Sequence, residues 1–197
     1  MQDKFYSDNR DLVKWSILHR LAETFQAHRI LQIAFYRKRK FPNVIIDGEE
    51  HDIPQEVLSH FRDLCTIEGI KSEIRITVFD KLFENREDYL KSVRVFLSNF
   101  LEEKCVVFLD PDTGLEPQKN PNKNHVLESE AKSIWDAMDS GDVYVFYQHQ
   151  TTRSKKPWIE PKRRQLENSL GIDNNSIKIA HGPKIARDVV FFYAQKP

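Results

Sequence analysis

The sequence predicts a three-layer α/β domain on a mostly parallel sheet, with an antiparallel hairpin at the C-terminal end of the chain. Predicted helices and strands alternate along the 197 residues, as in folds built around parallel strands. Several predicted strands are continuous apolar runs, as expected for strands covered on both faces. The last two, 177–180 and 188–194, are joined by a connector too short for a helical crossover. Five strands should therefore run one way and one should be reversed.

The first half of the chain supplies the first predicted helix and strand. Apolar residues recur at three- and four-residue spacing over 11–25, which predicts an amphipathic helix, and the apolar run from Ile30 to Tyr36 predicts a strand. Asp47-Gly48-Glu49-Glu50 is a turn signal, so we expect a hairpin insertion over 43–53. The other expected elements here are a helix over 54–65, a strand over 74–79 and a helix over 86–101.

The second half continues the alternation. Val106 to Leu109 are apolar and partly β-branched, which indicates a buried strand. Gly171 should end a helix in the C-cap position. The remaining expected elements are a helix over 125–138, a strand over 142–148 and a helix over 160–170. We expect residues 1–197 to form one α/β domain.

Composition restricts the classes of function. Thirty basic and thirty acidic residues give zero formal charge, so a nucleic-acid partner would have to meet a local patch. Cys65 and Cys105 are the only cysteines, so the sequence favours neither a disulfide framework nor a zinc site built from thiolates. No apolar run approaches the roughly 18 residues of a membrane span. We expect a cytoplasmic protein that does not enter a membrane.

The run Asp110-Pro-Asp112-Thr-Gly114 follows the buried strand that ends at Leu109. Ligands gather at the carboxyl ends of parallel strands. Pro111 favours an extended Asp110 and Gly114 permits positive φ, so the loop should turn sharply and hold both carboxylates near each other. The alternative is a strand-to-helix turn in which the aspartates only bond to backbone.

Two basic segments offer contacts for a polyanion. Arg37 to Lys40 follows the first strand, and Arg153 to Trp158 combines cations with an indole. Phosphate contact and base stacking use this mixture of side chains. The nucleic-acid-binding candidates are Arg37, Lys38, Arg153, Lys155, Lys156 and Trp158. The alternative is two solvated loops with Trp158 packed on the sheet.

A mostly parallel sheet with a reversed C-terminal strand resembles the class I S-adenosylmethionine-dependent methyltransferase fold. Asp110-Pro111-Asp112-Thr113 occupies the place of the Asp/Asn-Pro-Pro-aromatic motif of amino methyltransferases that act on nucleic acid. The resemblance implies that Asp110 accepts a hydrogen bond from the target amine and that S-adenosylmethionine is the cofactor. Only Asp110 and Pro111 match: Thr113 offers no ring and Asp112 replaces a proline.

The segment Asp11-Leu-Val-Lys14-Trp15 is loosely similar to the amino-terminal segment of ribosomal RNA adenine methyltransferases, in which a lysine lies near the cofactor. This resemblance makes Asp8, Asp11, Lys14 and Gly114 the cofactor-binding candidates. The chain also resembles an uncharacterised bacterial family that shares this opening and the Asp-Pro-Asp-x-Gly-Leu run, which implies no activity. The alternative is a helix start capped by Asp8 or Asn9, with Lys14 in solvent.

The first strand departs from the methyltransferase pattern. Cofactor binding there normally uses a glycine-rich turn, which lets the backbone approach the ligand. The segment from Ile30 to Pro42 contains no glycine. The sequence therefore predicts a degenerate S-adenosylmethionine site.

Two other readings remain open beside a divergent methyltransferase acting on nucleic acid. Asp110 and Asp112 could bind Mg²⁺ or Mn²⁺ in a phosphodiesterase or nuclease. Asp80 and His149 end other predicted strands and would supply a third ligand or a proton acceptor; His149 is otherwise a hydrogen-bonded residue at the end of the sheet. The third reading is a non-catalytic module that binds a nucleotide or a protein.

Overall fold

The central sheet has six strands in the order β4-β1-β5-β8-β10-β9. The computed structural model describes residues 9–38, 40–150 and 157–197. The strands of the sheet, in chain order, are β1 (Arg29–Ile33), β4 (Arg75–Phe79), β5 (Cys105–Leu109), β8 (Val143–His149), β9 (Lys178–Gly182) and β10 (Ala186–Gln195). Their order confirms a sheet in which the chain crosses over repeatedly.

Strand directions confirm the predicted fold class. β1 is parallel to both β4 and β5, and β5 is parallel to β8. β10 lies between β8 and β9 and is antiparallel to both. The turn between β9 and β10 is closed by a 2.9 Å hydrogen bond from Ile185 N to Gly182 O, which leaves no room for a crossover helix.

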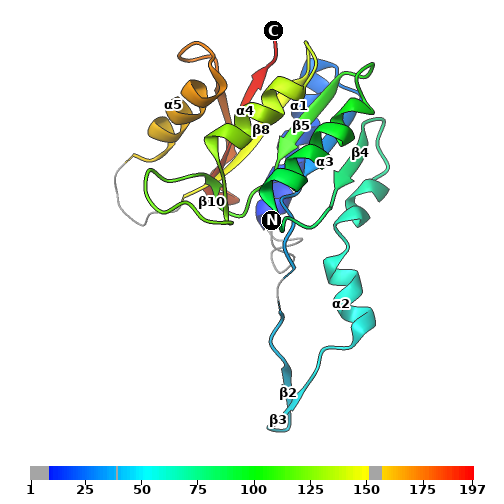
Figure 1. Cartoon of the computed structure of the whole chain (residues 1–197). Coiled ribbons are helices and arrows are strands. Elements are labelled where there is room, and N and C mark those ends of the chain that lie inside the picture. The colour runs from blue at the N-terminus through cyan, green and yellow to red at the C-terminus, as the bar shows by residue number, and fades with distance from the viewer. Residues whose placement is uncertain (1–8, 39, 151–156) are drawn as a thin grey trace.

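Helices cover both faces of the sheet and make it the middle of three layers (Figure 1). One hydrophobic cluster joins α1 (Asn9–Phe25) to alternate residues of the strands, such as Ile30 and Phe108. The other joins the opposite face, including Leu31 and Val107, to three helices. These are α3 (Arg86–Ser98), α4 (Glu128–Ala137) and α5 (Ile159–Leu170). The apolar runs of β1 and β5 are therefore buried on both sides.

A slender arm projects from the body between β1 and β4 (Figure 1). We call residues 43–62 the arm. It consists of the two-stranded hairpin β2 (Val44–Ile46) and β3 (Glu49–His51), followed by α2 (Gln55–Arg62). The 3-10 helix η2 (Leu64–Gly69) returns the chain to the body, where Leu64 is buried.

Local structure differs from the sequence-based expectation at three places. The helix expected over 54–65 ends at Arg62, and Leu64–Gly69 forms a 3-10 helix. The helix expected from His125 begins instead at Glu128, because β7 (His125–Val126) pairs with β6 (Gly114–Leu115) in a short parallel bridge. The strand expected through Tyr36 ends at Ile33, and Phe35 adopts a left-handed backbone with φ 44°. Gly171 does end α5 in a left-handed C-cap, as predicted. Among the described residues, no helix combines the length and apolarity needed to span a membrane.

Candidate functional site

A buried ionic cluster lies where β5 ends. Asp110 Oδ2 accepts hydrogen bonds from Lys14 Nζ at 3.0 Å and from Gln32 Nε2 at 2.7 Å. Lys14 also donates to Asp11, three residues earlier on α1. The side chains of Lys14 and Asp110 are only 4% and 3% exposed. We call Asp11, Lys14, Gln32 and Asp110 the Lys14 cluster.

Charge pairing keeps Lys14 protonated in this buried position. Burial by itself lowers the pKa of Lys14, but the negative charges of Asp110 and Asp11 and the hydrogen bonds to both raise it above its usual value. The ammonium also lies 5.9 Å from the ring centroid of Phe108 and 6.0 Å from that of Tyr147. Lys14 therefore holds the Asp110 carboxylate against the end of the sheet as a fixed cation.

Asp112 points to a different partner. Its Oδ2 accepts from the Arg37 guanidinium, which also donates to the Asn124 side chain. Asp112 is nearly buried, and Arg37 is about one-fifth exposed. Thr113 Oγ1 donates to Asn124 O at 2.8 Å. The loop after β5 thus sends its first carboxylate to α1 and its second to the segment after β1.

Position 114 requires glycine because the Gln148 side chain lies too close to leave room for a Cβ. The φ of Gly114 is +119°, which confirms the positive φ predicted for it, and an added Cβ would lie 2.4 Å from the Gln148 side chain. Gln148 Oε1 accepts from Leu115 N at 2.9 Å and its Nε2 donates to Thr113 O at 3.1 Å. Gln148 therefore fixes the loop against β8, and the space beside Gly114 is taken by protein.

His149, the last residue of β8, belongs to a second polar group. Its Nε2 lies 3.1 Å from Asp188 Oδ2, and Arg10 donates to both oxygens of Asp188. The hydrogen bond from Arg10 and the charges of Arg10 and His149 lower the pKa of Asp188, against the effect of burial. The three side chains are about one-third exposed. Tyr147 belongs to β8, like His149, and its ring lies near the Lys14 ammonium of α1. Burial raises the pKa of Tyr147.

The turn after β1 bears directly on cofactor binding. Ala34, Phe35 and Tyr36 are all buried. Phe35 N donates to Tyr89 Oη at 2.9 Å, and the Phe35 ring packs edge-on against Phe83. This turn does not fit a ligand that needs close approach to the backbone, because side chains fill the place that a glycine-rich turn leaves open. A cofactor at this edge would be held by side chains instead.

Most of the described cations near α5 bind the protein itself. Lys162 donates to the backbone oxygens of Leu115 and Glu116, and burial lowers its pKa. Trp158 is partly buried and packs on the hydrophobic core. Lys38 is exposed. The nucleic-acid candidates Arg153, Lys155 and Lys156, and the cofactor candidate Asp8, lie outside the described residues.

The metal interpretation finds no ligand group. Among residues 9–38, 40–150 and 157–197, no three His, Cys, Asp or Glu side chains lie together as a metal site would require. Asp80 is exposed at the end of β4 and lies beside the Cys65 thiol, with Cys65 Sγ 3.7 Å from Asp80 Oδ2. Burial and the charge of Asp80 raise the pKa of Cys65 to about 11.

Sequence reasoning missed three partners in these groups. Gln32 is a buried amide within the apolar run of β1, and that break in the run was the available signal. Arg10 and Asp188 are 178 residues apart, and nothing local marks either as a partner of His149. The motifs identified the strand ends, whereas the pairing had to come from packing.

Five strands of the sheet run in one direction, and the reversed strand β10 is inserted between β8 and β9. This is the arrangement that the sequence resemblance implies. The fold is methyltransferase-like. No protein-family model matches the chain, and no curated protein matches it.

Three solved structures align with most of this chain at low sequence identity. A DUF574 family protein from Streptomyces avermitilis is 11% identical with a TM-score of 0.45, over 96% of this chain and 82% of that one. The S-adenosylmethionine-dependent methyltransferase SibL, in its apo form, is 11% identical with a TM-score of 0.38, over 93% and 56%. PigF with SAH is 12% identical with a TM-score of 0.40, over 99% and 61%.

Proposed function

We propose that this methyltransferase-like protein is a divergent S-adenosylmethionine-dependent enzyme that methylates an amine of nucleic acid. The contact between Lys14 and Asp110 carries the proposal. The two residues are 96 positions apart, and each belongs to a segment that resembles a different part of the methyltransferase site. Their hydrogen bond joins those segments at the carboxyl edge of the sheet, where ligands of open α/β sheets bind.

Side chains at this edge offer contacts for the cofactor, which would supply the methyl group. Asp80 follows β4, the neighbour of β1, and its exposed carboxylate can accept hydrogen bonds from ribose hydroxyls. The Lys14 cluster lies at the end of the adjacent β5. Phe35 and Tyr36 replace the glycine turn between them, so the affinity should be weaker than close backbone contact would give.

We assign His149 the role of proton acceptor for the target amine. Asp188 holds its Nε2, and Nδ1 makes no hydrogen bond within the described part of the chain. A base oriented by a carboxylate through one ring nitrogen can take a proton at the other. His149→Gln should lower kcat and leave KM nearly unchanged. A variant with a raised KM and an unaltered kcat would contradict this role.

Isothermal titration calorimetry with S-adenosylmethionine and its demethylated product tests the cofactor. We expect saturable binding of both below about 1 mM, corresponding to roughly 4 kcal/mol or more. Asp80→Ala should weaken binding at least about fivefold, roughly 1 kcal/mol. Glu102→Ala, an exposed carboxylate near the opposite edge, is the matched control and should have no effect. Absence of binding to either ligand at millimolar concentration would overturn the proposal.

The nucleic-acid partner is tested separately by fluorescence anisotropy with short RNA and DNA. Because phosphate contacts release counterions, affinity should fall steeply with salt. Lys155→Glu/Lys156→Glu should weaken binding and flatten the salt dependence, with Lys38→Glu adding a smaller loss. A salt-insensitive interaction would argue against phosphate contacts.

A non-catalytic module is the second candidate, and the buried Phe35 favours it. A ring at the turn after β1 closes the approach that a glycine leaves open. In that case the folded protein would bind nucleic acid in the anisotropy assay and would give no heat with either methionine-containing ligand. The two titrations therefore separate the two functions.

A further inference from the structure

We propose that the guanidinium plane of Arg37 is the stacking surface for the base that carries the target amine. This inference rests on the proposed function, because it assigns a substrate contact at the same site. The Arg37 side chain extends from the segment after β1 to the loop after β5, where it pairs with Asp112. The loop itself, Asp110-Pro-Asp-Thr113, contains no aromatic ring that could stack on a base.

The guanidinium of Arg37 is held by two anchors. It donates to the Asp112 carboxylate and to the side-chain oxygen of Asn124. Asn124 is in turn bound to the loop, since its backbone oxygen accepts from Thr113 N at 3.2 Å and from Thr113 Oγ1 at 2.8 Å. His149 N donates to Thr113 O at 3.0 Å, which joins the loop to β8. The plane is therefore preorganised, and a ligand would bind without ordering a long side chain.

Stacking and hydrogen bonding use different parts of a guanidinium. Its N–H groups lie in the plane, so the bonds to Asp112 and Asn124 are made by the edge, whereas a base stacks on the face. The Arg37 side chain is 22% exposed, against 4% for Lys14 in the buried cluster nearby, so solvent reaches Arg37. Bases stack on arginine planes as they do on aromatic rings.

Charge pairing favours a base over a phosphate as the ligand of Arg37. The carboxylate of Asp112 is only 5% exposed and neutralises the guanidinium at close range. A phosphate that approached Arg37 would also approach this carboxylate, and like charges repel each other. A neutral base meets no such repulsion, and its π-face is attracted to the cation.

Arg37 also lies near the proposed site of the target amine, which Asp110 marks. Asp112, the partner of Arg37, follows Asp110 by two positions, and two extended residues span at most about 7 Å. β1 and β5 are neighbours in the sheet, so both residues lie at the same carboxyl edge. A base whose amine reaches Asp110 therefore brings its ring close to Arg37.

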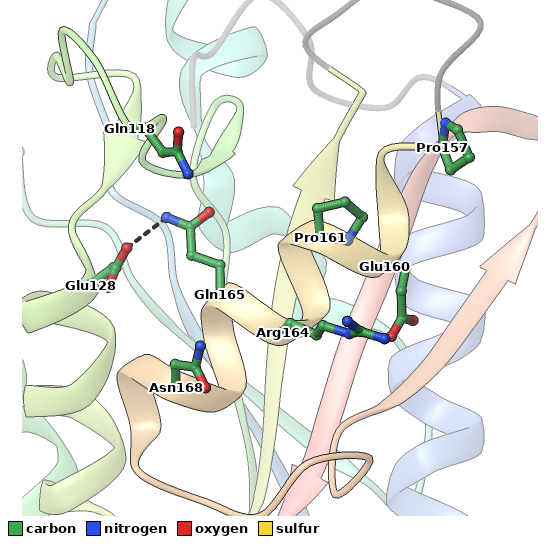
Figure 2. Close-up of a pocket in the computed structure, with 8 residues that line it drawn as sticks. All are labelled: Gln118, Glu128, Pro157, Glu160, Pro161, Arg164, Gln165 and Asn168. Carbon is green, nitrogen blue, oxygen red and sulfur yellow. Dashed lines mark hydrogen bonds and ion pairs between the residues drawn. The ribbon is translucent and has the colours of Figure 1, made fainter.

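Arg164 on α5 has a different setting (Figure 2). Its side chain is 70% exposed, and its Nε donates to Glu160 Oε1 at 3.0 Å on the same helix. The groove around Arg164 is lined by the carboxylates of Glu128 and Glu160, which disfavours a polyanion. A long exposed side chain also loses rotamer freedom when a ligand orders it. Arg164 is therefore the comparison for Arg37.

Fluorescence anisotropy with two single-stranded oligonucleotides of equal length tests the proposal. One strand carries adenine, a base with an exocyclic amine, at every position; the other is abasic, so the phosphate charges are equal. The wild type should bind the adenine strand about tenfold more tightly, as stacking of one base would give. This ratio should not change with salt, because stacking releases no counterions, although both affinities should fall.

Three variants identify the residue that recognises the base. Arg37→Lys keeps a cation beside Asp112 and removes the plane, so the ratio should fall to about twofold or less. Asn124→Ala removes one anchor of the plane and should give an intermediate ratio, which keeps the test valid if Arg37→Lys does not fold. Arg164→Lys makes the same exchange on α5 and should leave the ratio unchanged. Far-UV circular dichroism verifies that each variant is folded.

The outcomes separate this inference from the proposed function. Equal affinity of the wild type for the two strands, a ratio that disappears at higher salt, or a ratio that survives both Arg37→Lys and Asn124→Ala would overturn the stacking role. None of these results affects the cofactor titration, so methyl transfer would still stand. If the wild type binds neither strand, the nucleic-acid target of the proposed function fails, and the stacking role fails with it.

Discussion

Ionic groups of different exposure lie at the two ends of the neighbouring parallel strands β1 and β5. At the amino end of β1, Arg29 donates to Glu103 at 2.8 Å, and Arg75 from β4 donates to the same carboxylate. These side chains are between 15% and 61% exposed. At the carboxyl end of β5, Lys14 and Asp110 are almost completely buried. Water screens the first group and not the second, so equal numbers of ion pairs should have unequal effects on stability.

Lys14→Met should have the largest effect. It leaves the Asp11 and Asp110 carboxylates buried without their shared cation, which should cost about 3–5 kcal/mol of unfolding free energy. Urea denaturation measures the change. Arg20→Met removes an 82% exposed cation from the same helix and should change stability by less than about 0.5 kcal/mol. Equal losses in the two variants would remove the contrast between buried and exposed pairs.

Gly114→Ala should be the next most destabilising change at the carboxyl edge. The new Cβ meets the Gln148 side chain and the backbone has positive φ, so the cost should be about 2–4 kcal/mol. In a Gln148→Ala background the added cost should fall, because only backbone strain remains. Gly69→Ala, with open space and ordinary φ, is the control. Thermal unfolding of the wild type, Gly114→Ala, Gln148→Ala and the double variant measures the coupling between the two positions. Additive losses of stability would contradict the proposed contact.

Gln32→Leu sharpens the same comparison by removing one donor to Asp110 and leaving Lys14 in place. We expect a loss of about 1–2 kcal/mol, because a buried carboxylate loses one of its hydrogen bonds. Gln195→Leu removes an exposed amide that donates to Gly141 O, and its effect should be near zero. If Gln32→Leu left the free energy of unfolding unchanged, the hydrogen bond from Gln32 would not be needed to stabilise Asp110 Oδ2.

Glu103→Gln at the amino edge should have the smallest effect, up to about 1 kcal/mol at neutral pH. Burial raises the pKa of Glu103, but the hydrogen bonds and charges of Arg29 and Arg75 together lower it by more. The net effect is a pKa below the usual 4.5. A group with a lowered pKa contributes stability above its unfolded value and loses it as the pH falls through its folded value. Urea unfolding should therefore show the two proteins converging below about pH 4.5. A difference that persists there would exclude this ion pair as its cause.

Local pattern was enough for most elements. The unbroken apolar run of β5 identified a strand buried on both faces, and Gly171 marked the end of α5 because a left-handed C-cap favours glycine. Local pattern failed where contact with a distant segment determined the backbone conformation. His125 and Val126 pair with Gly114 and Leu115 instead of starting α4. Phe35 leaves the extended conformation where its amide meets Tyr89.

The sequence by itself determined the alternation of helices and strands, the reversed last strand and the carboxylates at the end of β5, because each depends on neighbouring residues. Only the tertiary structure decided that Asp110 binds Lys14 and Gln32 while Asp112 binds Arg37. Those pairings join residues 75 or more positions apart. They form because α1 and the end of β1 pack against the end of β5, and buried charges there must find partners that no local pattern specifies.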